Sequence, residues 1–287
     1  MRWLPLLGLI ACFPIFQDDS YTVDRVRVLG IRALPAEARP NTAVSYEALV
    51  AGPDGEVTEP VEWAWCITPR RAEERTGVTA SCGAGEDRQP IGASTVLLAD
   101  ACSRFGPIPP PVQGNEAPRR PADPDPTGGY HLPVHARVDG VEAIGFHRIR
   151  CDLAGATRDV FEAYQEEYTD NEHPVLAGVD LPATVEVGES VTLSVRATPD
   201  SAESYVLYVP ERSVLVDRTE TLTAWWYVTD GTLSRSRREL DGHTASTTWT
   251  APNRPGTVHG WVVLRDSRGG STWSAFTTGV RTPDVTP

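Results

Sequence analysis

Two stretches of this chain, 147 residues apart, repeat the same pattern of a proline-containing turn followed by a strand. In the first, Leu34-Pro35-Ala36 precedes an alternation of apolar and polar residues over 43–50. In the second, Leu181-Pro182-Ala183 precedes a similar alternation over 191–197. A period of two is typical of strands that bury one face. Because the match keeps register over both a turn and a strand, it predicts two copies of one β domain.

Further strands follow from the same alternation in both halves of the chain. We expect them over 23–30, 61–67, 130–138 and 143–153 in the first half, and over 205–209, 213–217, 222–229, 245–250, 257–265 and 271–280 in the second. The residues between 67 and 130 are expected to be mostly loop, apart from a helical turn over 100–105 and a proline-rich extended segment over 106–126. Over 157–168 the apolar period changes to that of a helix, with Thr157 at its N-cap.

The number and spacing of these strands, with tryptophans in the third one at Trp63 and Trp65, resemble the immunoglobulin-like sandwiches of bacterial surface proteins. The segments around Trp225-Trp226-Tyr227, Pro255-Gly256-Thr257 and 265–270 also resemble repeat modules of the polycystic-kidney-disease type. The resemblance implies an all-β fold of two immunoglobulin-like domains joined by a short helix and arranged as a rod. The expected boundaries are 22–156 for the first domain, 157–173 for the helical linker and 174–287 for the second domain.

The first twelve residues are typical of an export signal. One arginine precedes an apolar run from Trp3 to Ala11, and Leu9-Ile10-Ala11-Cys12 resembles the lipobox of bacterial lipoproteins. The resemblance implies a signal peptide over 1–11, lipid on Cys12 and a tether over 12–21. Phe13 lacks the aspartate that retains such proteins at the inner membrane, so an outer-membrane position, periplasmic or cell-surface, is expected. The alternatives are a plain secretory signal and an ordinary apolar start to a soluble domain.

The remaining four cysteines all lie in the first half of the chain, at Cys66, Cys82, Cys102 and Cys151. An even number of cysteines in an exported chain predicts two disulfides. We prefer Cys66 with Cys82 and Cys102 with Cys151, because these loops do not cross, and the nested pairing of Cys66 with Cys151 stays open. The sequence has no C-x-x-C pair and no histidine at ligand spacing from a cysteine, so neither a metal nor a cofactor is expected.

The strand over 222–229 predicts an outward-facing row of aromatic residues. If Trp226 faces the core of the second domain, Trp225 and Tyr227 face the opposite way. Trp261 and Trp273 on the neighbouring strands would continue the same row. An exposed row of this kind stacks on sugars or holds a partner protein. We prefer a second interpretation, in which the hairpin over 205–217 covers the row as a second small core, because large aromatic side chains are buried more often than displayed.

An acidic run lies where the two domains meet, and it consists of Asp159, Glu162, Glu166, Glu167, Asp170 and Glu172. Calcium at this junction is one interpretation, but the run matches no calcium loop, so a solvated helix face is preferred. Asp123 and Asp125 are similar and weaker candidates. His131 and His135 share a strand face but lie too far apart for one metal, and we expect them to be surface histidines.

Composition and motifs then limit the function. The net charge of -13 disfavours nucleic acid as a partner. The sequence contains no nucleophile elbow, metalloprotease helix, phosphate loop or cysteine–histidine pair, so we expect no enzyme. The hypothesis is a lipid-anchored binding or structural module of the cell envelope whose partner is an envelope protein or a glycan. The alternatives are a carbohydrate-binding accessory protein that uses the aromatic row and a hydrolase with its site in the long insertion.

Overall fold

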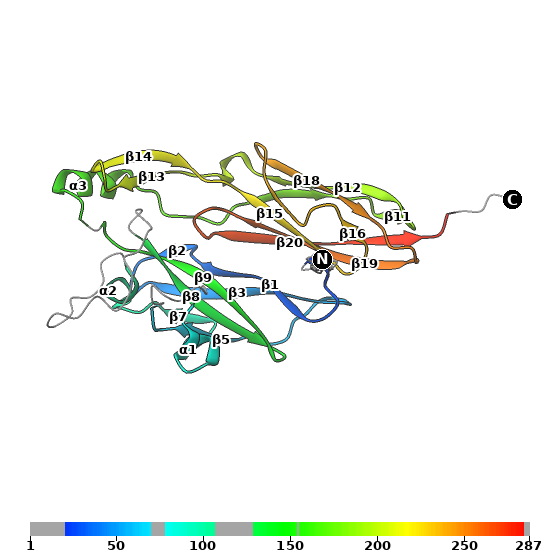
Figure 1. The fold of residues 1–287 in the computed structure, drawn as a ribbon, viewed down its shortest axis with the longest axis horizontal. Coiled ribbons are helices and arrows are strands. Elements are labelled where there is room, and N and C mark those ends of the chain that lie inside the picture. Colours follow the sequence, from blue (N-terminus) through cyan, green and yellow to red (C-terminus); the bar gives the residue numbers. More distant parts are fainter. Residues whose placement is uncertain (1–20, 70–77, 107–128, 154, 284–287) are drawn as a thin grey trace, which may run out of the picture.

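The computed structural model describes residues 21–69, 78–106, 129–153 and 155–283, and these form two β-sandwiches lying side by side (Figure 1). The expected fold class, two immunoglobulin-like sandwiches joined by a short helix, is confirmed. Among the described residues, no helix combines the length and the apolar character needed to cross a membrane.

The first domain contains two sheets. One has the order β1-β3-β4, with β7 also paired to β3, and the other has the order β2-β9-β8-β5-β6. The strands are β1 Arg27–Leu34, β2 Glu37–Ala38, β3 Ala43–Gly52, β4 Gly55–Glu56, β5 Glu62–Cys66, β6 Arg88–Ile91, β7 Ser94–Val96, β8 Gly129–Val138 and β9 Val141–Arg150. Two short helices, α1 Ala80–Ala84 and α2 Ala101–Phe105, lie in the connection between β5 and β8.

The second domain repeats this arrangement after the linker helix α3, Arg158–Glu167. Its sheets have the orders β10-β12-β18-β16 and β11-β20-β19-β15-β17, and a separate hairpin is formed by β13 and β14. The strands are β10 Leu176–Asp180, β11 Thr184–Glu186, β12 Ser190–Ala197, β13 Ser204–Val209, β14 Val214–Thr219, β15 Thr223–Val228, β16 Thr232–Leu233, β17 Arg237–Glu239, β18 Thr244–Thr250, β19 Gly256–Arg265 and β20 Ser271–Arg281.

The repeated Leu-Pro-Ala phrase marks the point where each domain's first strand changes sheets. In the first domain β1 pairs antiparallel with β3, and after Pro35 the chain forms β2, which pairs parallel with the last strand, β9. In the second domain β10 pairs antiparallel with β12, and after Pro182 the chain forms β11, which pairs parallel with β20. Proline suits such a crossing because it fixes φ and cannot donate to a sheet. The repeat in the sequence is therefore a repeat in topology.

Each sandwich has its own tryptophan-rich core. In the first domain Trp63 and Trp65 lie in the core, and the Trp65 indole donates to the Tyr46 hydroxyl, 2.9 Å away. In the second domain Trp226 is fully buried together with Trp249. The expected strand parity is confirmed, because Leu222, Ala224, Trp226 and Val228 all lie in this core.

Two disulfides hold the connection between β5 and β8 against the first domain. Cys66 on β5 bonds Cys82 on α1, and Cys102 on α2 bonds Cys151 just after β9. The preferred pairing is therefore the one that forms. The helical turn expected over 100–105 is confirmed as α2. The expectation that the rest of this connection is mostly loop is wrong for its described part, which includes β6, β7 and α1. Strands of three or four residues give too short an alternation to be recognised.

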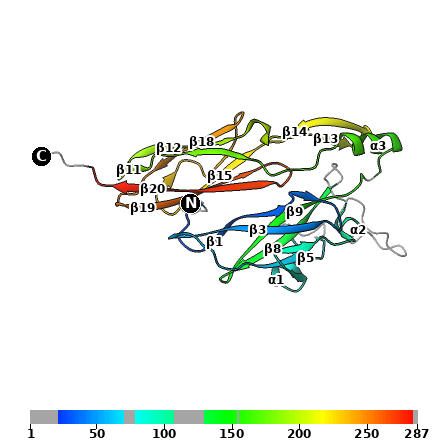
Figure 2. The same cartoon turned by 180° about the vertical axis from the view of Figure 1, so that it is seen from behind.

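The rod-like arrangement expected from the resemblance is also wrong. The sheet with β1 and β3 lies against the sheet with β15, β19 and β20, so the domains pack by their faces (Figure 2). The cause is visible in β3, where Leu49, Val50 and Ala51 are consecutive buried residues. A strand that is apolar on both faces needs a cover on both. The first domain supplies one cover from its own core and the second domain supplies the other.

We expect reduction of the disulfides to destabilise the first domain selectively. The bonds join residues 16 and 49 positions apart, and loops of such lengths contribute about 2 to 4 kcal/mol each. The measurement is amide hydrogen exchange of the full chain with and without reductant. Strands β5 and β8 should lose protection, whereas β12 and β18, on the far sheet of the second domain, should change little. Equal loss in both pairs of strands would contradict this assignment.

Candidate functional site: the junction between the domains

The predicted aromatic row lies inside the junction between the two domains. Trp261 on β19 is 1% exposed, and it packs with Leu29, Leu49 and Ala51 of the first domain. The other members, Trp225, Tyr227 and Trp273, are half-buried against the same cluster. The row is therefore not the exposed patch that would bind a sugar or a partner protein. The row faces away from the core of the second domain, as parity predicted, but another domain covers it.

The cover that we preferred for the row, the β13–β14 hairpin, packs elsewhere, so that expectation is wrong. Its residues Val206 and Tyr208 form a buried cluster with Tyr164 and Tyr168 from the linker helix and its C-terminal end. The hairpin thus covers α3, as Figure 1 shows at one end of the molecule. The apolar face of the helix packs on the hairpin. The hairpin therefore does not cover the aromatic row, which packs on the first domain instead.

Two residues of β1, Gly30 and Arg32, let the first domain pack closely on this row. A Cβ atom on Gly30 would lie 3.3 Å from the Trp273 ring, so the glycine permits a close approach of the backbone. The guanidinium carbon of Arg32 lies 4.4 Å from the centroid of the same ring. A cation over an indole face is attracted by the ring quadrupole. Gly30 and Arg32 therefore hold Trp273 from the same side of the strand.

The second domain also binds the backbone of β1. Arg265 donates to the carbonyl oxygen of Leu29 at 3.2 Å, and the Ser271 hydroxyl lies 3.4 Å from the carbonyl oxygen of Ile31. Strand β1 ends its sheet, with β3 as its one neighbour in the sheet order. An edge strand exposes unpaired backbone groups that must be satisfied or protected. Arg265 and Ser271 of the second domain therefore provide hydrogen-bond partners for carbonyl oxygens of this edge strand.

The chain ahead of β1 joins the same junction. Val23 is fully buried in the interdomain cluster, and its amide donates to the carbonyl oxygen of Val228 at 2.9 Å. Thr22 forms a parallel bridge with Val228, at the end of β15. The first described residues of the first domain are therefore attached to the second domain.

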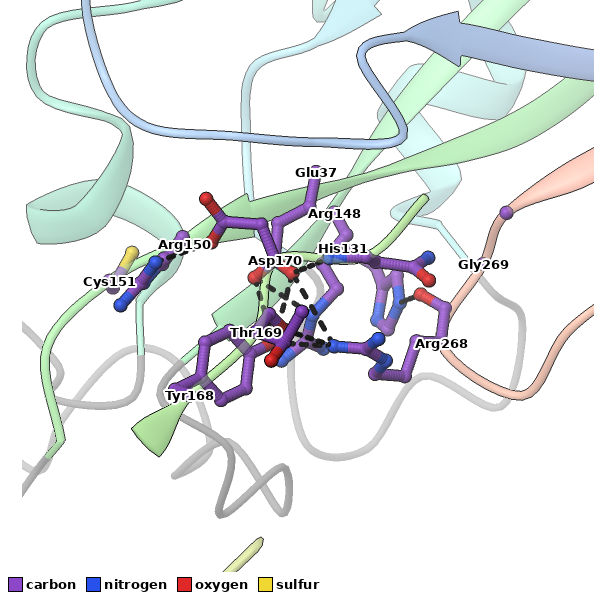
Figure 3. Close-up of polar contacts among 12 residues, drawn as sticks. Glu37, His131, Arg148, Arg150, Cys151, Tyr168, Thr169, Asp170, Arg268 and Gly269 are labelled. Carbon is purple, nitrogen blue, oxygen red and sulfur yellow. Dashed lines mark hydrogen bonds and ion pairs between the residues drawn. The ribbon is translucent and has the colours of Figure 1, made fainter. Parts of the chain in front are cut away.

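A buried ionic cluster lies at the end of the junction near the linker, centred on Arg268 (Figure 3). The Nε of Arg268 donates to Glu220 and its Nη2 donates to Glu203, each at 2.5 Å. Its Nη1 donates to the carbonyl oxygen of Thr169 at 2.7 Å, so the side chain also holds the linker. Arginine suits this position because its planar guanidinium offers five donors in a fixed fork.

Glu37 of β2 carries the same cluster into the first domain. One of its oxygens accepts from Arg148 Nε at 3.1 Å, and the other accepts from the amide of Asn171 at 2.9 Å. The Tyr168 hydroxyl lies within 3.0 Å of both oxygens, and Arg268 Nη1 lies 4.0 Å away. A fully buried carboxylate needs this many partners, because an unpaired buried charge is strongly destabilising. Glu37 therefore depends on groups from both domains and the linker.

A tight turn presents Arg268 to the cluster. Asp266 Oδ1 accepts three consecutive backbone amides, those of Arg268, Gly269 and Gly270, at 2.7 to 2.8 Å. Gly269 has φ +109°, a left-handed conformation that favours glycine. A Cβ on Gly270 would lie 2.6 Å from the carbonyl oxygen of Glu172, so no larger residue fits there. The turn over 266–270 is therefore held in one conformation by its aspartate and glycines, and this conformation positions the Arg268 side chain.

Acidic groups outnumber basic groups in this cluster. Four carboxyl groups, from Glu37, Glu203, Glu220 and Asp266, share two guanidinium groups, from Arg148 and Arg268. Burial and the nearby charge of Asp266 raise the pKa of Glu220 to about 7, although Arg268 opposes the rise. Burial also raises the pKa values of Glu203 and Asp266. The excess negative charge thus favours a proton on the cluster near neutral pH.

The other predicted site residues lie apart from this cluster or at its edge. In the acidic run, Asp170 pairs with Arg150 and Glu162 pairs with Arg158, while Asp159, Glu166, Glu167 and Glu172 are exposed. Across the described ranges, no group of three His, Cys, Asp or Glu residues is placed to hold a metal ion. Cys12, Asp123 and Asp125 lie outside the described residues.

The two histidines of β8 are not the surface residues that were expected. His135 is 4% exposed and lies 3.5 Å from Glu142, and burial lowers its pKa. His131 is half-buried, and its Nε2 lies 3.2 Å from the carbonyl oxygen of Arg268 in the second domain. A neighbouring domain and neighbouring strands cover residues that strand spacing alone places at a surface.

Comparison with known proteins gives no family for the chain: no family model and no curated protein matches it. Among solved structures, the D00-D0 domain of Intimin is similar at 9% identity, covering 90% of this chain and 98% of that one, with a TM-score of 0.26. The adhesin InvE of Yersinia pseudotuberculosis is similar at 12% identity over 87% of this chain and 58% of that one, with a TM-score of 0.25. A conjugative transposon lipoprotein of Bacteroides eggerthii is similar at 14% identity over 37% of this chain and 94% of that one, also with a TM-score of 0.25. Likenesses at these scores transfer no function to this chain.

The adjacent tryptophans of β15 provide a matched test of the junction. We expect Trp226→Ala to destabilise the second domain by about 3 to 5 kcal/mol, because it empties a core site. Trp225→Ala should instead loosen the contact between the domains and leave the second core folded. Amide exchange of β18 reports on the core, and exchange of β1 reports on the junction. Loss of β18 protection in both variants, or unchanged β1 protection in Trp225→Ala, would contradict the placement of the row.

A second prediction concerns the protonation of Glu220. Its folded pKa lies above the ordinary glutamate value, so its contribution to stability is complete below that ordinary value and is lost as the pH rises through about 7. Glu220→Gln stays neutral, and we expect its unfolding free energy to fall less than that of the wild type between pH 5 and pH 8. Urea unfolding at several pH values measures this, with Glu239→Gln at an exposed strand as the control. Parallel pH profiles for wild type and Glu220→Gln would rule out this role.

Proposed function

We propose that this protein is a non-catalytic module of the cell envelope whose two immunoglobulin-like domains act as one rigid binding or spacer unit. The observation that carries the proposal is the burial of the aromatic row, with Trp261 at its centre, between the domains. Side chains that could have bound an external ligand are used to fix one domain on the other. A rigid pair keeps its outer surfaces at a constant distance from the point of attachment.

The cysteines support an extracytoplasmic location. Both disulfides lie in the first domain, and such bonds form and persist in oxidising compartments such as the periplasm and the cell surface. The lipobox-like sequence ending at Cys12 supports attachment through lipid, and Phe13 supports sorting to the outer membrane. We therefore place the module at the outer membrane, on its periplasmic or cell-surface side, with an envelope protein or glycan as its partner.

The packing of the aromatic row favours this structural role over carbohydrate binding. Stacking on a sugar needs an open ring face. The face of Trp273 is approached by Gly30 and Arg32, and Trp261 is enclosed by β1 and β3. The row would become available to a glycan if the domains separated.

The anchor can be tested with two neighbouring substitutions. We expect wild-type protein to partition into detergent with the outer membrane and Cys12→Ser to lose this partition, because stable anchoring requires several acyl chains on the cysteine. Phe13→Asp is the matched control, since it keeps the cysteine and is expected to move the protein to the inner membrane. Cell fractionation with detergent phase separation measures all three proteins. If wild type and Cys12→Ser were both soluble in the cytoplasm, the anchor and the envelope location would be wrong together.

A further inference from the structure

His173, in the linker after α3, contacts both domains through its two ring nitrogens. Its Nε2 lies 2.6 Å from the carbonyl oxygen of Ala33 on β1. Its Nδ1 accepts the backbone amide of Ser271 on β20 at 3.0 Å. One imidazole therefore connects the edge strand of the first domain to the start of the last strand of the second domain.

These two partners fix the protonation state of the ring. A backbone amide can only donate, so Nδ1 must be the unprotonated nitrogen, and a carbonyl can only accept, so Nε2 must carry the hydrogen. Ser271 cannot turn its amide away, because Ser271 is held in the β19–β20 ladder opposite Arg265. A second proton on the ring would place two N–H groups against each other. The neutral ring is thus the form that joins the domains.

Charged groups from several elements face this ring. Arg32 on β1 disfavours a positive charge on it, whereas Glu47 on β3 and Asp266 in the β19–β20 turn favour one. Burial lowers the pKa of His173 below its ordinary value, and it outweighs the hydrogen bond to Ala33 and the two carboxylates, which all raise that pKa. His147 on β9 lies close enough for a charge on one histidine to disfavour a charge on the other. Burial lowers the pKa of His147 to about 4.

We propose that His173 is a pH-sensitive clasp, in which the neutral imidazole holds β1 against β20 and its protonation weakens the contact between the two domains. Because the folded state disfavours the charged ring, the stabilisation is present above the ordinary histidine pKa and is lost as the pH falls through and below it. Acidification would then loosen β1 at Gly30 and Arg32, the two residues that cover Trp273.

The clasp is separable from the ionic cluster because the two respond to pH in opposite directions. A proton on Glu220 relieves excess negative charge in the cluster, whereas a proton on His173 opposes a backbone donor. Global stability therefore combines the two effects. A local observable at Ser271 is needed to isolate the histidine.

The first test is made on the wild-type full chain. Nitrogen-15 correlation spectra of the imidazoles should show His173 as the Nε2–H tautomer with a pKa below the ordinary value of about 6.5. Hydrogen exchange of the Ser271 amide, corrected for its intrinsic rate, should accelerate between pH 7.5 and pH 5. The linkage relation sets a ceiling of roughly thirtyfold for this change. An Nδ1–H tautomer, or protection of Ser271 that does not change with pH, would overturn the proposal.

A pair of variants tests whether His173 causes the change. In His173→Gln the side chain can still donate to Ala33 but cannot titrate, so the pH dependence of Ser271 protection should disappear. His243→Gln removes an exposed histidine of the second domain and should retain the wild-type dependence. Wild-type pH dependence in His173→Gln would overturn the proposal. If that variant does not fold, the tautomer and pKa in the wild-type chain still decide the question.

Discussion

The burial of one aromatic face between two sandwiches is the constraint on which the rest of this structure depends. Strand β19 is apolar on both sides, with Val258, Val262 and Leu264 in its own core and Trp261 and Val263 in the junction. Each large apolar side chain that leaves water contributes about 1.5 to 3 kcal/mol. Several such side chains at one junction outweigh the ordering of a short linker. The two domains are therefore held as one body.

Polar groups decide how that apolar contact is oriented. Hydrophobic contact alone is non-directional. The direction comes from contacts with fixed geometry, such as Arg265 and Ser271 with the carbonyl oxygens of β1, and Arg268 with the linker. Buried ion pairs add little net stability compared with apolar packing, but breaking one leaves a buried charge unpaired. We infer that the Arg268 cluster mainly selects one relative position of the domains.

The two-domain organisation and the inner and outer faces of the strands could be predicted from the pattern of residues. The repeated Leu-Pro-Ala phrase predicted two copies of one fold, and alternation placed Trp226 inside and Trp225 outside. Alternation identifies an apolar outer face but does not say what covers it. The choice between the hairpin and the first domain depends on contacts such as Leu29 with Trp261, which are more than 200 residues apart in the chain.

The ionic cluster was missed for the same reason. Its members come from separate elements, with Glu37 on β2, Arg148 on β9 and Arg268 in a turn of the second domain. Single charged residues in a sequence of this charge density give no signal that they will meet. One local hint was present in 266–270, where an aspartate precedes two glycines around Arg268. Such a sequence favours a tight turn that presents its central side chain.

Small-angle X-ray scattering of the full chain in solution reports how the two domains are placed without altering any residue. Because the domains pack by their faces, we expect one compact distance distribution with a single maximum. A distribution with two maxima and a long tail, as two domains joined end to end would give, would rule out the packing of the two sandwiches on each other. The aromatic row would then be open to solvent.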